Sequence, residues 1–364
     1  MEGKGVCSQT WFTSAMSLTK SGASNVPDSY ILPSSARPNA TLTPSTTLPI
    51  VDLSMLHHPS LRSRVVNEIR SACKEIGFFQ VINHGIPLHV MKDALDAVMG
   101  FFDLPLEEKM LLMSGNVHAP VRYGTSLNHS RDKVHFWRDF IKHYSHPISE
   151  WIHLWPANPP SYSIKILNLQ WLTSERKMAK YATAVQNLQK QLMRVVLESL
   201  GLNPNYLQNE IEEGSQVMTM NCYPACPEPQ LTLGMPLHSD YGSLTILLQS
   251  CTGLQIMDQN KNWISVPMTE GALLVQLGDQ VEVMSNGQYK SVVHQATVSP
   301  QRKRFSIASL HSLALNKKVG PAPELVDEQH PTSYKEFSFS DFLDYISNND
   351  ILDGRFIDTL KKNP

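Results

Sequence analysis

Two side chains that can bind metal ions lie two positions apart in HSDYGSLTILLQ, residues 238–249. Residues i and i+2 of a strand point to the same face, so His238 and Asp240 can reach one point in space. His294, in the later stretch SVVHQAT, offers a third ligand. Two histidines and a carboxylate on one face of an octahedral ion are typical of non-haem Fe(II) that activates O2. Zinc hydrolases with these ligand types usually carry HExxH on a helix, and the sequence lacks this motif.

A lone HxD pair does not establish a metal site, because the chain has 14 histidines and such a pair arises easily. The alternative interpretation is that His238 and Asp240 form a hydrogen-bonded pair on the surface. Other motifs in the same part of the sequence favour the metal site.

A second pair with the same spacing, Arg304 and Ser306, lies in RFSIASL. A guanidinium with a hydroxyl beside it can bind a carboxylate, the guanidinium through two hydrogen bonds. The alternative is that Arg304 forms an internal ion pair, because a buried arginine without an anion is costly. Asn221 and Tyr223 form a third i, i+2 pair, whose amide and phenol could hydrogen-bond to the carboxylate or the metal ligands; the alternative is that they fill the core.

The elements that must position these residues are short strands. Beyond about residue 216, β-rich runs follow one another with turn signals between them, of which Asn286-Gly287 is a strong hairpin signal. The runs are VMTMNCY, LTILLQ, LQIMD, WISVP, LLVQL, YKSVVHQATV and RFSIASL. Many short strands without helices between them predict a closed sandwich or a double-stranded β-helix (jelly-roll) barrel.

Helical patterns flank the β-rich part, so the predicted fold class is α+β. Helices are expected near residues 61–76, 87–98, 104–113 and 177–200, and again in FSFSDFLDYI and FIDTLKK, with LPIVDL and FFQVIN as short strands. The expected parts are a flexible leader over 1–47, a mostly helical region over 48–200, the barrel over 201–320 and a C-terminal helical segment over 321–364. The leader is expected to be flexible because it is rich in Ser, Thr, Pro and Asn.

Composition excludes several classes of function. The 364-residue chain is 41% apolar and 18% charged with a net charge of −2, so no nucleic-acid partner is expected. The sequence has no apolar run that is long enough to predict a membrane span, and the N-terminus lacks the apolar core of a signal peptide. The five cysteines are scattered without zinc spacing. We therefore expect a reduced, cytoplasmic protein without a membrane partner, and a monomer.

The HxD pair, the distant histidine and the RxS pair together resemble the plant 2-oxoglutarate- and Fe(II)-dependent dioxygenases, a flavanone 3-dioxygenase-like family that oxidises small metabolites. The resemblance runs from about residue 48 to the C-terminus. LPIVDL, GFFQVINHGI and LPLEEKM resemble the N-terminal helical region of the family. Three later stretches resemble the catalytic core of the family: NCYPACPEPQLTLGMPLHSDYGSLTILLQ, GDQVEVMSNGQYKSVVHQ and RFSIASLH.

The resemblance implies a role for each motif. The implied iron ligands are His238, Asp240 and His294, the implied partners of the distal carboxylate of 2-oxoglutarate are Arg304 and Ser306, and the further cosubstrate contacts are Asn221 and Tyr223. It also implies Fe(II) as cofactor, 2-oxoglutarate and O2 as cosubstrates, and ascorbate as reductant. The implied reaction oxidises, most often hydroxylates, a small molecule and releases succinate and CO2.

Some positions depart from the family pattern. Cys222 stands where the family has the first residue of a Tyr-Tyr pair, and Gln295 follows His294 where arginine is usual. Leu310 and Ser312 replace the aromatic residue and the acid of flavonoid-acting members, which weakens a simple flavonoid assignment. Residues 163–175, with their apolar excess, look inserted; they are either a gene-model or splicing artefact or a loop that covers the substrate.

Substrate contacts are expected from residues around the barrel mouth. The candidates are Tyr123, Trp137, Phe140, Leu310 and the region of Phe342, each of which could instead belong to the core. Tyr123 stands out because RYGTS sets an aromatic ring in a turn-rich polar segment. Two other functions stay open: a barrel that binds a small ligand without catalysis, and an ascorbate-using oxidase on the same fold. The intact triad and RxS pair favour catalysis, whereas RxS does not exclude the oxidase.

Overall fold

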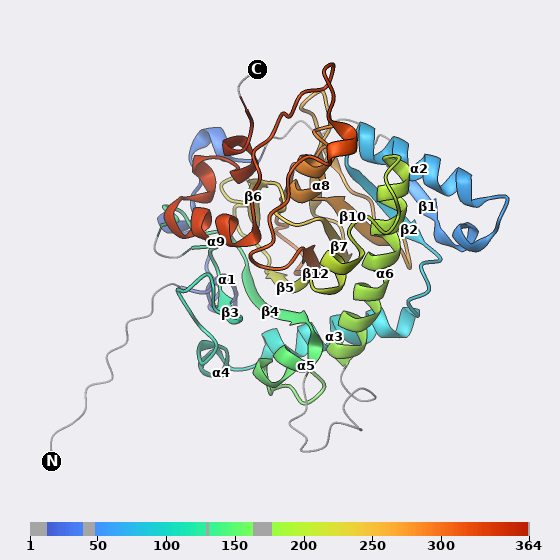
Figure 1. Cartoon of the computed structure of the whole chain (residues 1–364). Helices are drawn as coiled ribbons and strands as arrows, with labels where there is room; N and C mark the ends of the chain where they lie inside the picture. Colours follow the sequence, from blue (N-terminus) through green and yellow to red (C-terminus); the bar gives the residue numbers. More distant parts are fainter. Residues whose placement is uncertain (1–12, 39–47, 129–130, 163–176, 363–364) are drawn as a thin grey trace, which may run out of the picture.

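Two β-sheets form the centre of the chain, with helices around them (Figure 1). The computed structural model describes residues 13–38, 48–128, 131–162 and 177–362. The large sheet has eight strands in this order: β1 (Ile50–Asp52), β2 (Phe78–Ile82), β10 (Leu273–Leu277), β7 (Leu244–Gln249), β12 (Arg304–Ser312), β5 (Ser215–Tyr223), β4 (Asp139–His146) and β3 (Val121–Gly124). The four strands of the small sheet are, in order, β6 (Met235–His238), β11 (His294–Ala296), β8 (Leu254–Met257) and β9 (Trp263–Ser265). Mixed helices and sheets confirm the α+β class.

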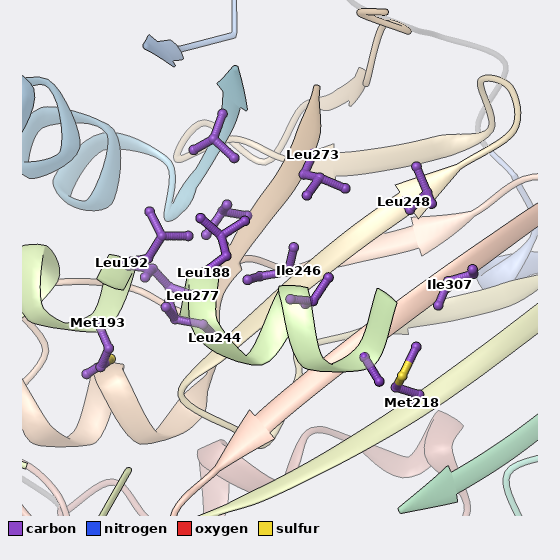
Figure 2. Packing of buried hydrophobic residues seen from close by; sticks show 14 of the residues in the cluster. Leu188, Leu192, Met193, Met218, Leu244, Ile246, Leu248, Leu273, Leu277 and Ile307 are labelled. Atoms are coloured by element: carbon purple, nitrogen blue, oxygen red, sulfur yellow. The ribbon is translucent and has the colours of Figure 1, made fainter. Parts of the chain in front are cut away.

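Three long helices pack against one face of the large sheet. They are α2 (Arg62–Glu75), α3 (Leu88–Asp103) and α6 (Lys177–Ser199). The side chains of strand β7 alternate between the two faces of the sheet, so this strand contributes to both the core and a cavity. Leu244 and Ile246 point to the helices, where Leu188 and Leu192 of α6 meet them (Figure 2). Thr245, between them in sequence, points to the other face and lines a cavity.

The C-terminal helix lies on the cavity side of the molecule. The shorter helices are α1 (Ala15–Lys20), α4 (Leu106–Met110), α5 (Ile148–Trp151), α7 (Gln208–Glu212), α8 (Asp279–Met284) and α9 (Phe339–Asn348). A capping box between Ser338 and Asp341 begins α9. The ring of Phe339 then stacks on Tyr241, with ring centroids 4.3 Å apart. This contact holds α9 beside the cavity, which Phe342 also lines.

The helices predicted near residues 61–76, 87–98 and 177–200 are confirmed as α2, α3 and α6. The β-rich runs are confirmed as β5 and β7 to β12. The expectation of no helix among these strands is wrong. Helix α8 lies between β10 and β11. Asn286-Gly287 does not form a hairpin; it follows α8 with φ angles of 50° and 80°. The N–H of Gly287 donates to the carbonyl of Glu282 at 2.9 Å, so the pair ends the helix. Left-handed residues suit a helix C-terminus as well as a hairpin turn.

The region over 48–200 contains more strand than expected, because β3 and β4 extend the large sheet beyond β5. β4 pairs with β5 along most of its length, so this region supplies one side of the cavity in addition to the helices. FIDTLKK, expected as a helix, contains the short 3-10 turn Phe356–Thr359.

Part of the expected flexible leader is ordered. In the described residues 13–38, Tyr30 and Leu32 are fully buried, because they fill hydrophobic clusters against the core. The backbone N–H of Ala15 donates to the buried carboxylate of Asp139 at 3.0 Å, and Ser14 donates to the same carboxylate. Residues 1–12 and 39–47 of the leader, and the apparent insertion at 163–175, lie outside the described residues. Among the described helices, none is long and apolar enough to cross a membrane.

Candidate active site

A cavity lies between the two sheets and is lined by residues of both. On the large sheet, the register of β12 against β5 pairs Ser306 with Asn221 and Arg304 with Tyr223, so these four residues share the cavity face. On the small sheet, His294 of β11 pairs directly with His238 of β6. The structure therefore brings together motifs that are far apart in the sequence.

The three candidate metal ligands meet at the end of β6. Oδ1 of Asp240 lies 3.8 Å from Nε2 of His238 and 3.9 Å from Nε2 of His294. One ligand atom from each residue lies within 4.8 Å of the others, a spacing that one ion can bridge. Asp240 and His294 are buried and His238 is half-buried, so the surface-pair alternative does not describe the site.

Hydrogen bonds behind the triad orient each ligand. Nδ1 of His238 donates to the carbonyl of Pro236 at 2.8 Å, and Nδ1 of His294 donates to that of Val292 at 3.1 Å. A carbonyl only accepts, so the neutral form of each ring carries its lone pair on Nε2, which faces the other ligands. Burial and the nearby His294 lower the pKa of His238, so the imidazole stays neutral, as metal binding requires.

The carboxylate of Asp240 is held from behind by Thr245. Oγ1 of Thr245 donates to Oδ2 of Asp240 at 2.5 Å, which leaves Oδ1 for an ion. Thr245 was not among the predicted site residues. Its position in LTILLQ carried a usable signal, because it is the first polar residue of a buried strand and alternation places it on the cavity face.

Arg304 is buried without a carboxylate partner in the described part of the chain. Its Nε donates to the carbonyl of Cys251 at 3.2 Å and its Nη2 to Oε1 of Gln249 at 3.0 Å. Nη1 is buried without a hydrogen-bond partner. The guanidinium also lies 4.8 Å from the ring centroid of Tyr223. The internal ion pair considered above is therefore wrong for the described residues, and a fixed cation with a free donor faces the cavity.

Asn221 is positioned by a residue that the sequence analysis missed. Its Oδ1 accepts from Nη1 of Arg138 at 2.9 Å, and its Nδ2 donates to Oγ of Ser306 at 3.4 Å. Arg138 is buried and lines the cavity. The signal was its place two residues before Phe140 in HFWRDF, since alternate residues share a face.

The candidate substrate contacts divide into two groups. Phe140, Leu310 and Phe342 line the cavity. Tyr123 and Trp137 do not line it. Both are fully buried in the core. Strand alternation in β3 turns Tyr123 away from the cavity, and its Oη donates to Asp139 at 2.8 Å. Trp137 lies just before β4, and its Nε1 donates to the carbonyl of Ala225 at 3.2 Å.

Comparisons with known proteins agree with this geometry. The family described as "non-haem dioxygenase in morphine synthesis N-terminal" matches residues 48–158, and the 2OG-Fe(II) oxygenase superfamily matches residues 214–312. Flavanone 3-dioxygenase 3 of Oryza sativa subsp. japonica is 44% identical over 320 residues, which are 86% of this chain and 93% of the relative. DOWNY MILDEW RESISTANCE 6 of Arabidopsis thaliana is 34% identical over 323 residues, covering 87% and 90%.

A solved structure is similar over nearly the whole chain. The crystal structure of JOX2 in complex with 2OG, Fe and JA has a TM-score of 0.83 and 29% sequence identity, and covers 97% of this chain and 98% of its own. The two family matches and the identities above 30% over most of each relative show the family. The chain belongs to the plant family of 2-oxoglutarate- and Fe(II)-dependent dioxygenases.

Proposed function

We propose that His238, Asp240 and His294 hold Fe(II) in this chain, that Arg304 anchors 2-oxoglutarate, and that the chain hydroxylates a small plant metabolite. As a member of its family, the chain is an oxidoreductase that uses Fe(II), 2-oxoglutarate and O2. One observation supports the residue assignment above all others: the open triad and the unpaired Nη1 of Arg304 line the same cavity.

The donor set fits the ion. Two imidazoles and one carboxylate oxygen are the donor set that would hold Fe(II) and leave further positions for cosubstrate and O2. Fe(II) with 2-oxoglutarate and O2 supplies the oxidant that removes hydrogen from a C–H bond, with succinate and CO2 as products. The chain itself fixes the three ligand atoms through Pro236, Val292 and Thr245, so they need little rearrangement when the ion binds.

The cosubstrate would lie between the triad and β12. Nη1 of Arg304 can donate to the distal carboxylate, and the hydroxyl of Ser306 lies on the same face two residues later. Tyr223 supports the guanidinium from its ring face. Asn221 lies between Ser306 and Arg138, and these contacts fix its amide on the face that would meet the cosubstrate.

The substrate would occupy the rest of the cavity. Phe140, Leu310 and Phe342 provide apolar surface, and α9 covers that side of the cavity. This surface excludes water and orients the C–H bond that reacts. The relatives support a small metabolite, since one is named a flavanone dioxygenase and JOX2 holds JA. Leu310 lines the cavity in place of the family's aromatic residue, which weakens a simple flavonoid assignment, whereas Ser312, in place of the acid, does not line it.

Several finer features are part of the proposal. The two sheets close into a jelly-roll barrel; a hydrophobic cluster that joins Leu247 and Leu274 of the large sheet to Ile256 and Ile264 of the small one supports this closure. The leader, N-terminal, barrel and C-terminal parts keep the boundaries given above, and the family matches at 48–158 and 214–312 fall within the second and third. We place the protein in the cytoplasm as a monomer, with ascorbate as its reductant.

The test is turnover with natural metabolites. The purified chain is prepared with Fe(II) under anaerobic conditions, mixed with plant metabolite extract, 2-oxoglutarate and ascorbate, and exposed to O2. Consumption of 2-oxoglutarate, formation of succinate and a product 16 mass units above a consumed compound are expected for hydroxylation. Product formation that is independent of 2-oxoglutarate would contradict the proposal and favour the oxidase.

A further inference from the structure

The cavity has a basic wall, of which the cosubstrate assignment uses only one contact, that of Arg138 with Asn221. Arg122 on β3, Arg138 just before β4 and Lys142 on β4 all line it, at the edge of the large sheet beyond β5. Arg122 and Arg138 are buried and Lys142 is half-buried. These residues are separate from Arg304, which lies on β12.

Two of the three cations face each other. The antiparallel register of β3 and β4 pairs Arg122 directly with Lys142, and like charges in this position destabilise a sheet. Burial and the charge of Arg122 lower the pKa of Lys142 to about 7. Near neutral pH the fold therefore holds Arg122 opposite an amine that is protonated only in part, and an anion beside the pair would favour the protonated form.

The side chains of Arg122 and Lys142 donate their hydrogen bonds to neutral backbone carbonyls. Arg122 donates to the carbonyls of Ser114 and Ser126, at 2.8 and 3.0 Å, and Lys142 donates to the carbonyl of Val117 at 2.7 Å. No carboxylate of the described chain lies within ion-pair distance of any of the three cations.

Arg138 adds a free donor to this wall. Its Nη1 is used by the amide of Asn221, whereas its Nε is buried without a hydrogen-bond partner. Asp132 lines the same cavity, but burial raises its pKa to about 7, so near neutral pH it offsets the wall only in part. Buried cations without a counter-ion are costly, and an anionic ligand would remove that cost.

An aromatic surface lies within the basic wall. The guanidiniums of Arg122 and Arg138 lie 5.2 and 5.0 Å from the ring centroid of Phe140. Leu310 and Phe342 add further apolar lining. The combination suits a ligand with an apolar body and one anionic group.

We propose that the metabolite oxidised by this chain carries a carboxylate, which binds Arg122, Arg138 and Lys142 while its apolar part lies against Phe140. The proposal rests on the proposed function, because it places the reacting C–H bond over the metal triad. Arg138 then links the two ligands, since it contacts the substrate carboxylate and also holds Asn221 beside the cosubstrate.

Binding is tested on the full chain loaded with Fe(II) and 2-oxoglutarate without O2. Calorimetric titrations compare phenylacetate, 3-phenylpropanoate and cinnamate with their primary amides, which keep the shape and remove the charge. At least one acid should bind about tenfold or more tightly than its amide, because it gains charge-assisted hydrogen bonds. Lys142→Met and Arg138→Gln should each reduce that preference severalfold. Lys317→Met, outside the cavity, is the matched control and should keep it.

A second measurement does not depend on the choice of acid. Plant metabolite extract is divided by anion exchange, and each fraction is tested for stimulation of 2-oxoglutarate consumption. The retained, acidic fraction should stimulate it. Stimulation by the neutral fraction alone, or acids that bind no better than amides, would overturn the inference. Failure of the parent protein to bind 2-oxoglutarate would instead contradict the proposed function, so the two failures are distinguishable.

Discussion

Thr245 donates a hydrogen bond of 2.5 Å to Oδ2 of Asp240, and this bond decides which oxygen of the carboxylate faces His238 and His294. The donor comes from β7 of the large sheet, whereas the two histidines come from the small sheet. The candidate metal centre is therefore assembled across the two sheets and depends on their relative position.

The first prediction concerns this bond. Thr245→Val keeps the shape of the side chain and removes the donor, so Asp240 loses its orientation and Fe(II) affinity should fall about 10- to 100-fold. Thr245→Ser retains the hydroxyl and should stay close to the parent protein. Anaerobic chelator competition measures both affinities. Equal Fe(II) affinity in the valine and serine variants would show that Thr245 does not act on the site.

The second prediction concerns the space behind Arg304. Gly253 has a φ of +149°, and a Cβ there would lie 2.8 Å from Cδ of Arg304. Gly253→Ala should displace the guanidinium and raise the KM for 2-oxoglutarate about tenfold, while Fe(II) affinity is unchanged. Gly271→Ala is the matched control, because Gly271 also has positive φ, +69°, but open space around its Cβ position. The same KM in both variants would argue against a cosubstrate role for this contact.

The third prediction separates core from pocket. Tyr123 donates to the fully buried Asp139, which also binds Ser14 and Ala15 of the N-terminal segment. Tyr123→Phe should lower the free energy of unfolding by about 1–3 kcal/mol, because a buried carboxylate loses a donor. The KM for substrate should not change. Urea unfolding gives the first quantity, with the more exposed Tyr206→Phe as control; a stable variant with a raised KM would place Tyr123 in the substrate site.

The fourth prediction is a pH dependence. The pKa of Lys142 is lowered to about 7 in the folded protein, whereas the pKa of a lysine in an unfolded chain is about 10.4. Between these values the unfolded chain binds a proton that the folded chain lacks, so stability should rise with pH by up to about 1.4 kcal/mol per unit from this residue. Lys142→Met should lose this rise relative to the parent protein. Urea unfolding between pH 7 and 9.5 measures it, and parallel profiles would indicate an ordinary pKa for Lys142.

The site motifs were predictable from sequence because they obey a simple rule. His238 and Asp240, like Arg304 and Ser306, are spaced by two, and strand alternation puts each pair on one face. Thr245 and Arg138 follow the same rule, but a hydrogen bond between sheets or strands has no signature in one sequence. The role of Arg138 appears only once β4 is paired with β5, and that of Thr245 only once β7 of the large sheet is placed beside Asp240.

The fold was harder to predict where local signals are ambiguous. Asn286-Gly287 predicts left-handed backbone correctly, yet the same backbone ends α8 instead of forming a hairpin. The leader was expected to be flexible from its composition, whereas in residues 13–38 a few apolar side chains such as Tyr30 and Leu32 reach the core. Such tertiary burial is not visible in local composition.

The most direct test of the central claim is the 2-oxoglutarate dependence of succinate formation in variants of Arg304. Arg304→Lys keeps the charge and loses the planar pair of donors, and Arg304→Ala loses both. A charge-assisted hydrogen bond contributes about 1.5–3 kcal/mol, so the alanine variant should need at least roughly ten- to a hundredfold more 2-oxoglutarate than the parent protein. The lysine variant should need a concentration between those two. Ser306→Ala should have a smaller effect, and Fe(II) affinity should not change in any of the three. If Arg304→Ala has the same 2-oxoglutarate dependence as the parent protein, Arg304 is not the cosubstrate anchor and the account is contradicted.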